Sequence, residues 1–458
     1  MKRTSTDLKM ETVRQWISSS DPAGILKIKN HFDPDNLLND DSGQGVLLTS
    51  LPVQSFSRTL IEQLAWFPAG IPAGTSTLIA SSRIGNQPDT KPYIFDAIRT
   101  LCPRFVRDNK FLISHDGIAT NAFVKRAANI FGTAFLEFRP FPKTLNSSWF
   151  EFVLNQQEDC FVAYYHANWQ TAITTAPDEL LIGACREAYL LSVRSNGNIS
   201  KSVQRRLNSN DELKFTFLLT ESPDTTKGTA CSLIEAGAIA WHLYQTTIEK
   251  PNASTPGKHR KLNEFKQQHQ LGDYLVHWTR RRNGPWPNQT QNQFVDNLIL
   301  GLSASDHSKI ATLIRIVATQ TLLATNSITR DSTPVVSFTE NRADQLAKLR
   351  KFRPHLSRWD FETVGIAIRR DVLQNHGARP VKYGTDQNFD KLSSNDRPFF
   401  QMEGTTIDWR NELEWRIPGN LNLNRIGTGD AFLFVDSAPD ADKIAAVSKW
   451  PVVLIDGE

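Results

Sequence analysis

The stretch Lys110–Phe138, "KFLISHDGIATNAFVKRAANIFGTAFLEF", decides the fold of the first half of the chain. Its opening apolar run predicts a buried strand over 110–114, and "HDGIAT" is rich in turn-forming residues. Apolar residues then recur at helical spacing from Asn121 to Phe131, and a second apolar run follows at 134–138. A strand, a helix and a strand in this order predict a βαβ unit.

The same alternation extends to both sides of this stretch. Compact apolar runs at 45–51 and 76–85 predict buried strands, and "SFSRTLIEQLAWF" and "KPYIFDAIRTLCPRF" have apolar residues at helical spacing. A second block, 178–244, repeats the pattern. We therefore predict a Rossmann-like α/β region with a mostly parallel sheet over 46–245, either undivided or split into βα subdomains at 46–145 and 150–245.

Three other segments complete the predicted organisation. Residues 1–45 form a polar leader that ends in the turn formers "NDDSGQG". Residues 246–272 are rich in Pro, Ser, Lys and Gln without an apparent apolar face, which is typical of a linker. Beyond them, short strands such as "YLVHWT" and "AFLFVD" alternate with longer helical or irregular stretches. We expect an α+β domain over 273–458.

Composition excludes several classes of protein. Hydrophobic residues make up 40% and charged residues 22% of the chain, which is typical of a folded globular protein. The net charge is only +4, so any nucleic-acid site must be local. The four cysteines form no CxxC pair, which argues against a zinc or disulfide framework and favours a reducing cytoplasm. No run of about 18 apolar residues could span a membrane. We expect a cytoplasmic protein with neither a membrane segment nor a metal site.

Three stretches of the N-terminal half could line a phosphate pocket: "SSRIGN" (81–86), "HDGIATNAF" (115–123) and "DTTKGTA" (224–230). The second opens a helix, whose N-terminal amides and dipole favour an anion. The alternative is that these Ser, Gly and Thr residues are helix caps and turn residues, which any α/β protein needs. His115 beside Asp116 could likewise be a general-base pair or an exposed loop histidine.

A strand ending in "ASSR", followed by a strand, a Gly-containing turn and a helix, resembles the Rossmann-like nucleotide-sensing families that include the DNA-processing protein Smf and the LOG proteins. The resemblance covers about residues 46–140. It implies a nucleotide or nucleic-acid ligand near Ser82, Arg83, Gly117 and Thr120. The glycine-dense turn usual in such proteins is reduced here to Gly117.

Polar residues gather on three predicted strands of the C-terminal half. In "YLVHWT", strand alternation would place His277 and Thr279 on one side. "TPVVSFTEN" (333–341) ends with Ser337 and Thr339 among its polar residues. These residues are followed, more than sixty positions later, by a third strand with two carboxylates.

That third strand lies in "DWRNELEWRIPGNL" (408–421), which places Glu412 and Glu414 one residue apart. Alternate strand residues share a face, so the two carboxylates could serve one cleft, and two close carboxylates raise the pKa of one of them. The alternative is a water-facing row of Glu412, Glu414 and Arg416, with Leu413 and the other intervening residues in the core.

The order of these strands resembles a family of bacterial proteins of unassigned function over about residues 273–455, and it is similar to the ADP-ribosyltransferase fold. The resemblance implies NAD as the cofactor. It also implies that His277 and Thr279 hold the nicotinamide ribose, that Ser337 and Thr339 brace the site, that Glu414 stabilises the oxocarbenium and that Glu412 orients the acceptor. The middle strand departs from the family by reading "SFT" instead of Ser-Thr-Ser.

Basic and aromatic residues interleave in "AKLRKFRPHLSRWDF" (347–361), a composition that suits phosphate neutralisation and base stacking. The residues expected to contact nucleic acid or phosphate are Arg350, Arg353, Arg358 and Trp359. The alternative is a solvated helix face beside a core tryptophan.

Three functional hypotheses follow. The first is a stress or phage-defence effector with a nucleotide-sensing N-terminal region and an NAD-using, ADP-ribosyltransferase-like C-terminal domain. The second is a non-catalytic protein that binds nucleic acid or a protein partner through 347–361. The third is a nucleotide-binding N-terminal enzyme with a structural C-terminal half. If the first is correct, His277, Thr339 and Glu414 should converge in one cleft.

Overall fold

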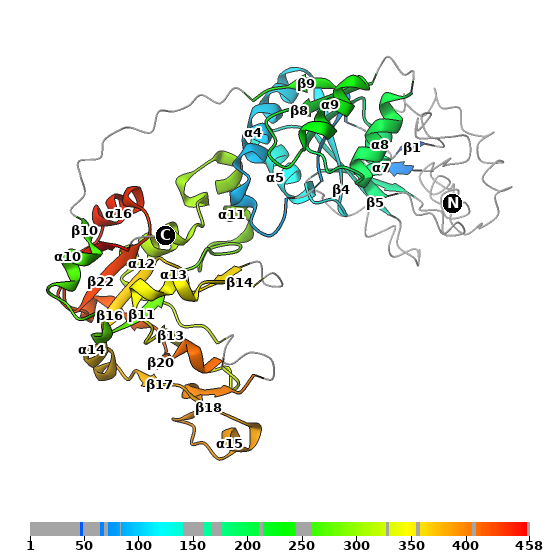
Figure 1. Ribbon diagram of the computed structural model, residues 1–458. Helices are drawn as coiled ribbons and strands as arrows, with labels where there is room; N and C mark the ends of the chain where they lie inside the picture. The colour runs from blue at the N-terminus through cyan, green and yellow to red at the C-terminus, as the bar shows by residue number, and fades with distance from the viewer. Residues whose placement is uncertain are drawn as a thin grey trace. The chain divides into compact units, whose positions relative to one another are not determined.

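A computed structural model gives the architecture of the protein (Figure 1). It describes residues 46–48, 65–67, 72–82, 84–140, 160–165, 176–209, 214–243, 259–326, 329–353, 358–404 and 409–455. The chain forms two compact units. Unit 1 comprises Met1–Thr246 and Gly284–Ser305, and unit 2 comprises Thr247–Asn283 and Asp306–Glu458. The predicted leader lies outside the described residues.

Unit 1 is built on a nine-stranded sheet in the order β1-β2-β6-β5-β4-β3-β7-β8-β9. The seven strands from β6 to β9 are parallel, and β1 and β2 add an antiparallel edge. The strands are β1 (Val46–Leu48), β2 (Ala65–Phe67), β3 (Thr75–Ser81), β4 (Lys110–His115), β5 (Phe135–Pro140), β6 (Phe161–Tyr165), β7 (Glu187–Ser192), β8 (Phe215–Leu219) and β9 (Ile239–Trp241). The predicted Rossmann-like α/β region is confirmed.

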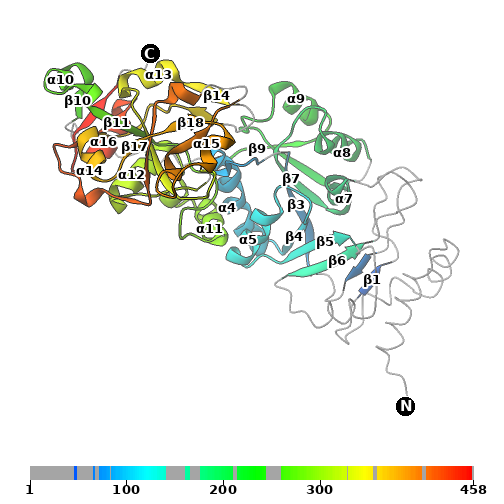
Figure 2. The ribbon, with the colours of Figure 1, turned by 90° about the horizontal axis from the view of Figure 1, so that it is seen from below.

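Helices cover both faces of this sheet, as expected for parallel strands buried on both sides. One core lies between the sheet and helices α7 (Pro177–Ala184), α8 (Asn198–Leu207) and α9 (Lys227–Glu235). The other lies under α4 (Pro92–Arg107) and α5 (Asn121–Phe131). Figure 2 shows α7 and α8 on one side of β3 and β7, with α4 and α5 on the other.

A helix from much later in the chain completes unit 1. Helix α11 (Gln291–Leu300) buries Phe294 and Ile299 in the core under α4 and α5, and Arg126 Nε lies 2.5 Å from Asp296 Oδ1. Residues 284–305 therefore do not belong with the rest of the predicted C-terminal domain. The sequence gives no local signal of this because an apolar helix face does not specify which core it joins.

Unit 2 is an α+β structure on an eight-stranded mixed sheet in the order β10-β23-β22-β16-β11-β13-β20-β17. Its strands are β10 (His259–Lys261), β11 (Tyr274–Trp278), β13 (Val335–Thr339), β16 (Gly365–Arg369), β17 (Arg379–Pro380), β20 (Glu414–Pro418), β22 (Ala431–Val435) and β23 (Val452–Leu454). Three two-stranded sheets accompany it: β12 (Thr321–Leu322) with β21 (Leu421–Asn422), β14 (Lys351–Arg353) with β15 (Arg358–Asp360), and β18 (Lys382–Gly384) with β19 (Phe400–Met402).

The helices of unit 2 are short. They are α10 (Leu262–Lys266), α12 (Lys309–Thr319), α13 (Leu346–Leu349), α14 (Arg370–Asn375), α15 (Asp386–Asp390) and α16 (Ala438–Ala445). Side chains from opposite faces of the large sheet enter two separate cores, because successive strand residues alternate between faces. Leu275 and Phe338 lie in one of them, and Tyr274 and Val276 in the other.

Two sequence predictions differ from these elements. Residues 259–272 of the expected linker form β10, α10 and a short 3₁₀ turn, and Leu262 and Phe265 of α10 are buried. These two apolar side chains are three residues apart and form one face of the helix. The polar composition of the segment hides this face in the sequence. Most of the helix predicted in "SFSRTLIEQLAWF" lies outside the described residues, and its last three residues are strand β2.

Candidate functional site

The candidate site lies at the carboxyl edge of the parallel sheet in unit 1, at the point where the order of successive strands changes direction. Strand β3 is central, β4 and β5 follow on one side, and β7 and β8 follow on the other. Helices α4 and α5 accordingly pack on one face and α8 and α9 on the other. In open α/β sheets, ligands bind outside the carboxyl ends of the strands at such a switch point. Here it lies between β3 and β7.

Backbone and hydroxyl contacts tie the strand ends together at this point. The Ser82 N–H donates to Ser192 O at 2.9 Å, and the Arg194 N–H donates to the Ser82 hydroxyl at 3.0 Å. The Val193 N–H donates to Thr225 Oγ1, beyond β8, at 2.9 Å. Ser82, which was expected near the ligand, therefore fixes the geometry of the β3–β7 junction.

Buried serine hydroxyls gather at the same edge. Ser81 ends β3, Ser192 ends β7 and is its partner in the register, and Ser114 is the penultimate residue of β4. Each is buried, and the hydroxyls of Ser81 and Ser114 have no hydrogen-bond partner among the described residues, whereas the Ser192 hydroxyl lies beside that of Tyr93. A buried hydroxyl without a partner costs about 1–3 kcal/mol, so a polar ligand that meets it recovers binding free energy.

The turn from β7 into α8 has the features of an anion site. Only residues 193–197 separate the two elements, and Asn196 has a φ of 60°. The N-cap of α8 is Gly197, so no side chain caps the first-turn N–H groups. These N–H groups and the helix dipole favour a negative charge. Ser81 lies in the predicted stretch 81–86, whereas Ser192 and Gly197 were not predicted as site residues, although "SVRSNGNIS" (192–200) follows a predicted strand and contains Asn-Gly.

A second polar group lies between α4 and the end of β8. Lys91 Nζ lies 2.5 Å from Asp224 Oδ2, and the Tyr93 hydroxyl donates to the same oxygen at 2.8 Å. Burial, with the neighbouring Asp224 carboxylate, raises the pKa of Tyr93 to about 12, although Ser222 and Ser192 act in the opposite direction. Tyr93 is therefore a hydrogen-bond donor at neutral pH. Asp224 opens the predicted "DTTKGTA" stretch.

The β4 end carries the predicted "HDGIATNAF" turn. His115 is buried, and the Gly117 N–H donates to His115 Nδ1 at 2.8 Å. Asp116 Oδ1 also lies 2.9 Å from Nδ1, but burial lowers the pKa of His115 against the charges of Asp116 and Glu137. A neutral ring with Nδ1 accepting from the Gly117 N–H agrees with the lowered pKa, and it has no Nδ1 proton to share with Asp116. Gly117 and Thr120 thus have local roles. Gly117 binds the His115 ring through its N–H. Thr120 is the N-cap residue of α5, and its hydroxyl donates to Ile79 O at 3.3 Å.

The first strand-to-helix turn lacks the glycine-rich form of dinucleotide sites. Between β3 and α4 it spans ten residues and includes a 3₁₀ helix, Pro88–Thr90, with Gly85 as its one glycine. A tight turn for a pyrophosphate is therefore absent from the described part of this segment. Arg83, predicted to contact the ligand, lies outside the described residues.

In unit 2, the structure separates His277 from Ser337, Thr339 and Glu414, which lie together on one face of the large sheet. His277 shares a sheet face with Leu275 and lies 5.7 Å from Phe338 between ring centroids. Ser337 and Glu414 belong to the opposite face, because their strand neighbours Phe338 and Trp415 enter the His277 core. The predicted convergence of His277 with Glu414 is therefore wrong.

His277 and Thr279, which were predicted to hold the ribose, make hydrogen bonds to backbone carbonyl groups of unit 2. His277 Nδ1 lies 2.8 Å from Ser337 O, and burial lowers the pKa of His277, with this hydrogen bond opposing the shift. Thr279 is buried, and its hydroxyl lies 3.2 Å from the carbonyl oxygens of both Lys309 and Val364.

Glu414 is engaged by a buried arginine. Arg416 Nε donates to Glu414 Oε1 at 2.9 Å, and the Ser337 hydroxyl donates to the same oxygen at 2.7 Å. Arg416 is 1% exposed and also donates to Phe400 O at 2.8 Å and to Gln401 Oε1 at 2.6 Å. The prediction that Arg416 faces water is wrong, and the carboxylate of Glu414 is already neutralised by a structural partner.

Glu412 does not share the strand of Glu414. It ends a 3₁₀ turn, Trp409–Glu412, and Leu413 has a φ of 44° and is 49% exposed. The alternation expected across 412–414 is therefore broken, and Leu413 is not in the core. Thr339, which is buried, donates from its hydroxyl to Glu412 O at 2.5 Å.

The 347–361 stretch folds as the β14–β15 hairpin after the short helix α13, so the helix-face alternative is wrong for most of it. Trp359 and Arg350 are close to each other, and Arg353 and Arg358 are register partners.

An open pocket of about 640 Å³ lies elsewhere in unit 2, beside the start of α14. Its two arginines are paired with carboxylates: Arg369 with Asp371, and Arg370 with Glu340 at 2.7 Å. We prefer the carboxyl edge of unit 1 because its donors lie at a switch point. In the described residues, no group of three His, Cys, Asp or Glu side chains is arranged to hold a metal ion, and no helix could cross a membrane.

Unit 1 is thus a Rossmann-like α/β domain. No family model and no curated protein matches the chain. Among solved structures, the chain is similar to DNA processing protein A from Helicobacter pylori, whose structure was reported in a study of its single-stranded DNA binding mode. The sequence identity is 13% and the TM-score is 0.30, and the match covers 43% of this chain and 91% of that one. It is also similar to DNA processing protein A from Streptococcus pneumoniae, with 14% identity and a TM-score of 0.29 over 49% and 80%.

Both structures are DNA-processing proteins, the kind named in the resemblance of the N-terminal half, and neither is an ADP-ribosyltransferase. Similarity at these TM-scores carries no functional argument.

Proposed function

We propose that unit 1 binds a nucleotide, with its phosphate at the switch point between β3 and β7 and against the N-terminus of α8. The observation that carries the proposal is the buried, unpartnered hydroxyl of Ser81, beside the buried hydroxyl of Ser192 at the end of the adjacent parallel strand. The uncapped first turn of α8, after Gly197, supplies N–H donors at the end of one of these strands.

The chemistry of this edge suits a phosphate better than a cation. Its groups are hydroxyls and backbone N–H groups, and the carboxylate of Asp224, an exposed residue beyond β8, is already paired with Lys91 and Tyr93. Hydroxyl and N–H donors around an anion make charge-assisted hydrogen bonds, which are stronger than neutral ones. A role as the nucleotide-sensing part of a stress or phage-defence effector is the finer form of the proposal, and it rests on the sequence resemblance.

Isothermal titration calorimetry of the full chain against adenosine and guanosine mono-, di- and triphosphates and NAD tests this proposal. We expect one or more of these to bind, and we expect Ser81→Ala and Ser192→Ala each to weaken binding about 10-fold, as the loss of a hydrogen bond to a charged group predicts. Ser76→Ala is the matched control, because Ser76 lies near the amino end of the same strand, β3.

Adenosine without phosphate should bind much more weakly than its phosphates. Two results would reject the site: no binding across the whole series, or binding that Ser81→Ala and Ser192→Ala leave unchanged while the folded state is retained by circular dichroism.

A further inference from the structure

The β14–β15 hairpin of unit 2 stands outside the large sheet. Strands Lys351–Arg353 and Arg358–Asp360 pair antiparallel with each other and with no other described strand. An isolated two-stranded hairpin is at best marginally stable in water, so this one needs support from elsewhere. Its support and its exposed face together indicate a binding surface.

The exposed face carries two aromatic rings side by side. Phe352 and Trp359 are direct cross-strand partners, and their ring centroids lie 5.2 Å apart at an interplanar angle of 56°. Phe352 is 44% exposed and Trp359 is 39% exposed. Single exposed apolar residues are common, but an adjacent aromatic pair on a supported hairpin is a platform on which a flat ligand can stack.

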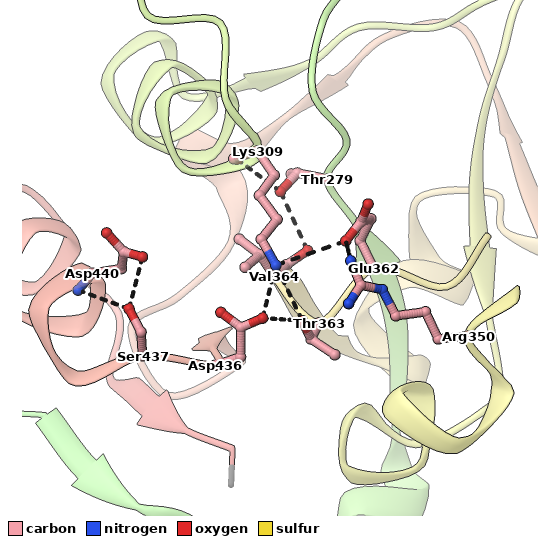
Figure 3. Close-up of polar contacts among 9 residues, drawn as sticks. All are labelled: Thr279, Lys309, Arg350, Glu362, Thr363, Val364, Asp436, Ser437 and Asp440. Carbon is pink, nitrogen blue, oxygen red and sulfur yellow. Dashed lines mark hydrogen bonds and ion pairs between the residues drawn. The ribbon is translucent and has the colours of Figure 1, made fainter. Parts of the chain in front are cut away.

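A charged network holds the base of the hairpin (Figure 3). Arg350, just before β14, donates to Glu362 Oε2, just after β15, at 3.1 Å. Lys309 Nζ lies 3.7 Å from the same Glu362 oxygen and 2.7 Å from Asp436 Oδ2. Thr363 donates to Asp436 and accepts from Lys309 at 3.2 Å. The two ends of the hairpin are thus joined to each other and to the ends of α12 and β22.

Arg350 connects this network to the aromatic face. Its guanidinium carbon lies 4.4 Å from the centroid of the Trp359 ring, within the range of a cation–π contact. The same guanidinium that closes the base of the hairpin therefore restricts the orientation of the indole. A ring held before the ligand arrives loses less conformational entropy on binding.

The charge of the segment favours an anionic polymer. Five basic residues stand between 346 and 362, against two acidic residues, Asp360 and Glu362. Both acids are buried, and Glu362 is bound by Arg350. Lys351, beside the aromatic pair, is exposed. Lys348 is exposed as well, so the exposed charged side chains described in this segment are both positive.

We propose that the β14–β15 hairpin binds single-stranded nucleic acid, with Phe352 and Trp359 stacking on bases and the exposed Lys348 and Lys351 neutralising phosphates. Aromatic rings stack on any base, and basic residues read only the backbone, so this platform favours unpaired strands with little sequence preference. Duplexes keep their bases stacked on each other and offer the rings no free face.

Fluorescence anisotropy with labelled oligothymidylate and oligouridylate of about 20 nucleotides tests the proposal, with a duplex of equal length for comparison. We expect the single strands to bind more tightly than the duplex, and affinity to fall as salt rises. Trp359→Ala and Phe352→Ala should each weaken binding about 10-fold, which is within the measured worth of one stacked base.

The matched control is Phe215→Ala in unit 1, which removes another exposed phenyl ring, 47% exposed, from a strand. Trp359→Phe keeps a stacking ring and should stay within about threefold of the wild type, which separates loss of stacking from loss of folding. Lys351→Ala should reduce the salt slope by about 0.7.

The proposal is overturned if neither strand binds at about 50 mM salt. It is equally overturned if Trp359→Ala binds like the wild type, or if Phe215→Ala weakens binding as much as Phe352→Ala. A protein partner would then be the next occupant to test. Because the hairpin and the nucleotide site use different residues in different units, Ser81→Ala should leave strand binding unchanged.

Discussion

At the scale of single residues, two buried arginines hold parts of the fold together by binding carbonyl groups. Arg206 is 4% exposed and donates to Cys185 O at 2.9 Å, Arg186 O at 2.7 Å and Phe215 O at 3.0 Å. In unit 2, Arg416 donates to the carbonyl oxygen of Phe400 and also to the carboxylate of Glu414. Strand and helix periodicity cannot predict such residues, because an arginine in a pattern indicates a solvent-facing position until its partners are known.

Glu414→Gln should therefore lower stability. It leaves the buried Arg416 guanidinium without its counter-charge, a change that costs about 3 kcal/mol or more. Urea and thermal unfolding measure this loss. Glu403→Gln, at an exposed ion pair with Arg410, is the matched control and should cost less than about 1 kcal/mol. If the protein consumes NAD and Glu414→Gln abolishes that activity without lowering stability, Glu414 is catalytic and our structural assignment is wrong.

A second residue-scale prediction concerns pH. Burial alone would raise the pKa of Glu137, but hydrogen bonds from Asn121 at 2.7 Å and Arg139 at 2.9 Å, with the charge of Lys125, lower it below its usual range. A carboxyl with a lower pKa in the folded state stabilises that state above its unfolded pKa of about 4.3. This contribution is lost as pH falls through the folded pKa.

Urea midpoints measured from pH 7 downward should thus fall in the wild type below about pH 4.3 more steeply than in Glu137→Gln, which cannot titrate there. Glu235→Gln, at an exposed position in unit 1, should keep the wild-type slope. Parallel pH profiles for wild type and Glu137→Gln would contradict the role of Glu137.

At the scale of elements, local signals predicted well and long-range ones did not. The helix Asn121–Phe131 has the predicted bounds, because its apolar spacing and its terminal Gly132 are local features. Strand β20 starts two residues later than an alternating Glu-Leu-Glu would require, because Leu413 adopts a left-handed conformation that no local residue demands. The proximity of Ser192 to Ser81 was not predicted, because it depends on the strand order, which periodicity does not give.

Replacing each of two glycines by alanine tests two different effects, backbone strain at Gly132 and steric clash at Gly365. Gly132 has a φ of 72° with nothing within 4 Å of an added Cβ, so Gly132→Ala should cost about 1 kcal/mol through strain alone. Gly365 in β16 would place a Cβ 2.2 Å from His277 O. Gly365→Ala should therefore cost several times more, or prevent folding. Denaturant unfolding of both variants checks this order, and equal losses would contradict it.

At the scale of the whole molecule, unit 1 is assembled from two separate stretches of chain. Helix α11, from residues 284–305, covers the α4–α5 side with Phe294, Val295, Leu298 and Ile299. A chain cut after about residue 250 would lack this cover.

A chain ending at Thr246 should unfold at lower temperature than unit 1 does in the full protein, and it should bind the hydrophobic dye ANS, which reports exposed apolar surface. Adding residues 284–305 through a Gly/Ser linker should restore cooperative unfolding, and the same addition with Phe294→Asp should not. A chain ending at Thr246 that is as stable as the completed unit would show that α11 is dispensable.

The late position of α11 also sets the order in which the protein can mature during synthesis. Fifty-nine residues separate Thr246 from Ser305, and at translation rates of about 5–20 residues per second the ribosome needs roughly 3–12 s to supply them. Throughout that interval the nascent α4–α5 surface is bare, while the first part of unit 2 is already emerging. The nascent chain therefore exposes an apolar surface that chaperones can bind, and the N-terminal unit cannot finish folding before part of unit 2 has been synthesised.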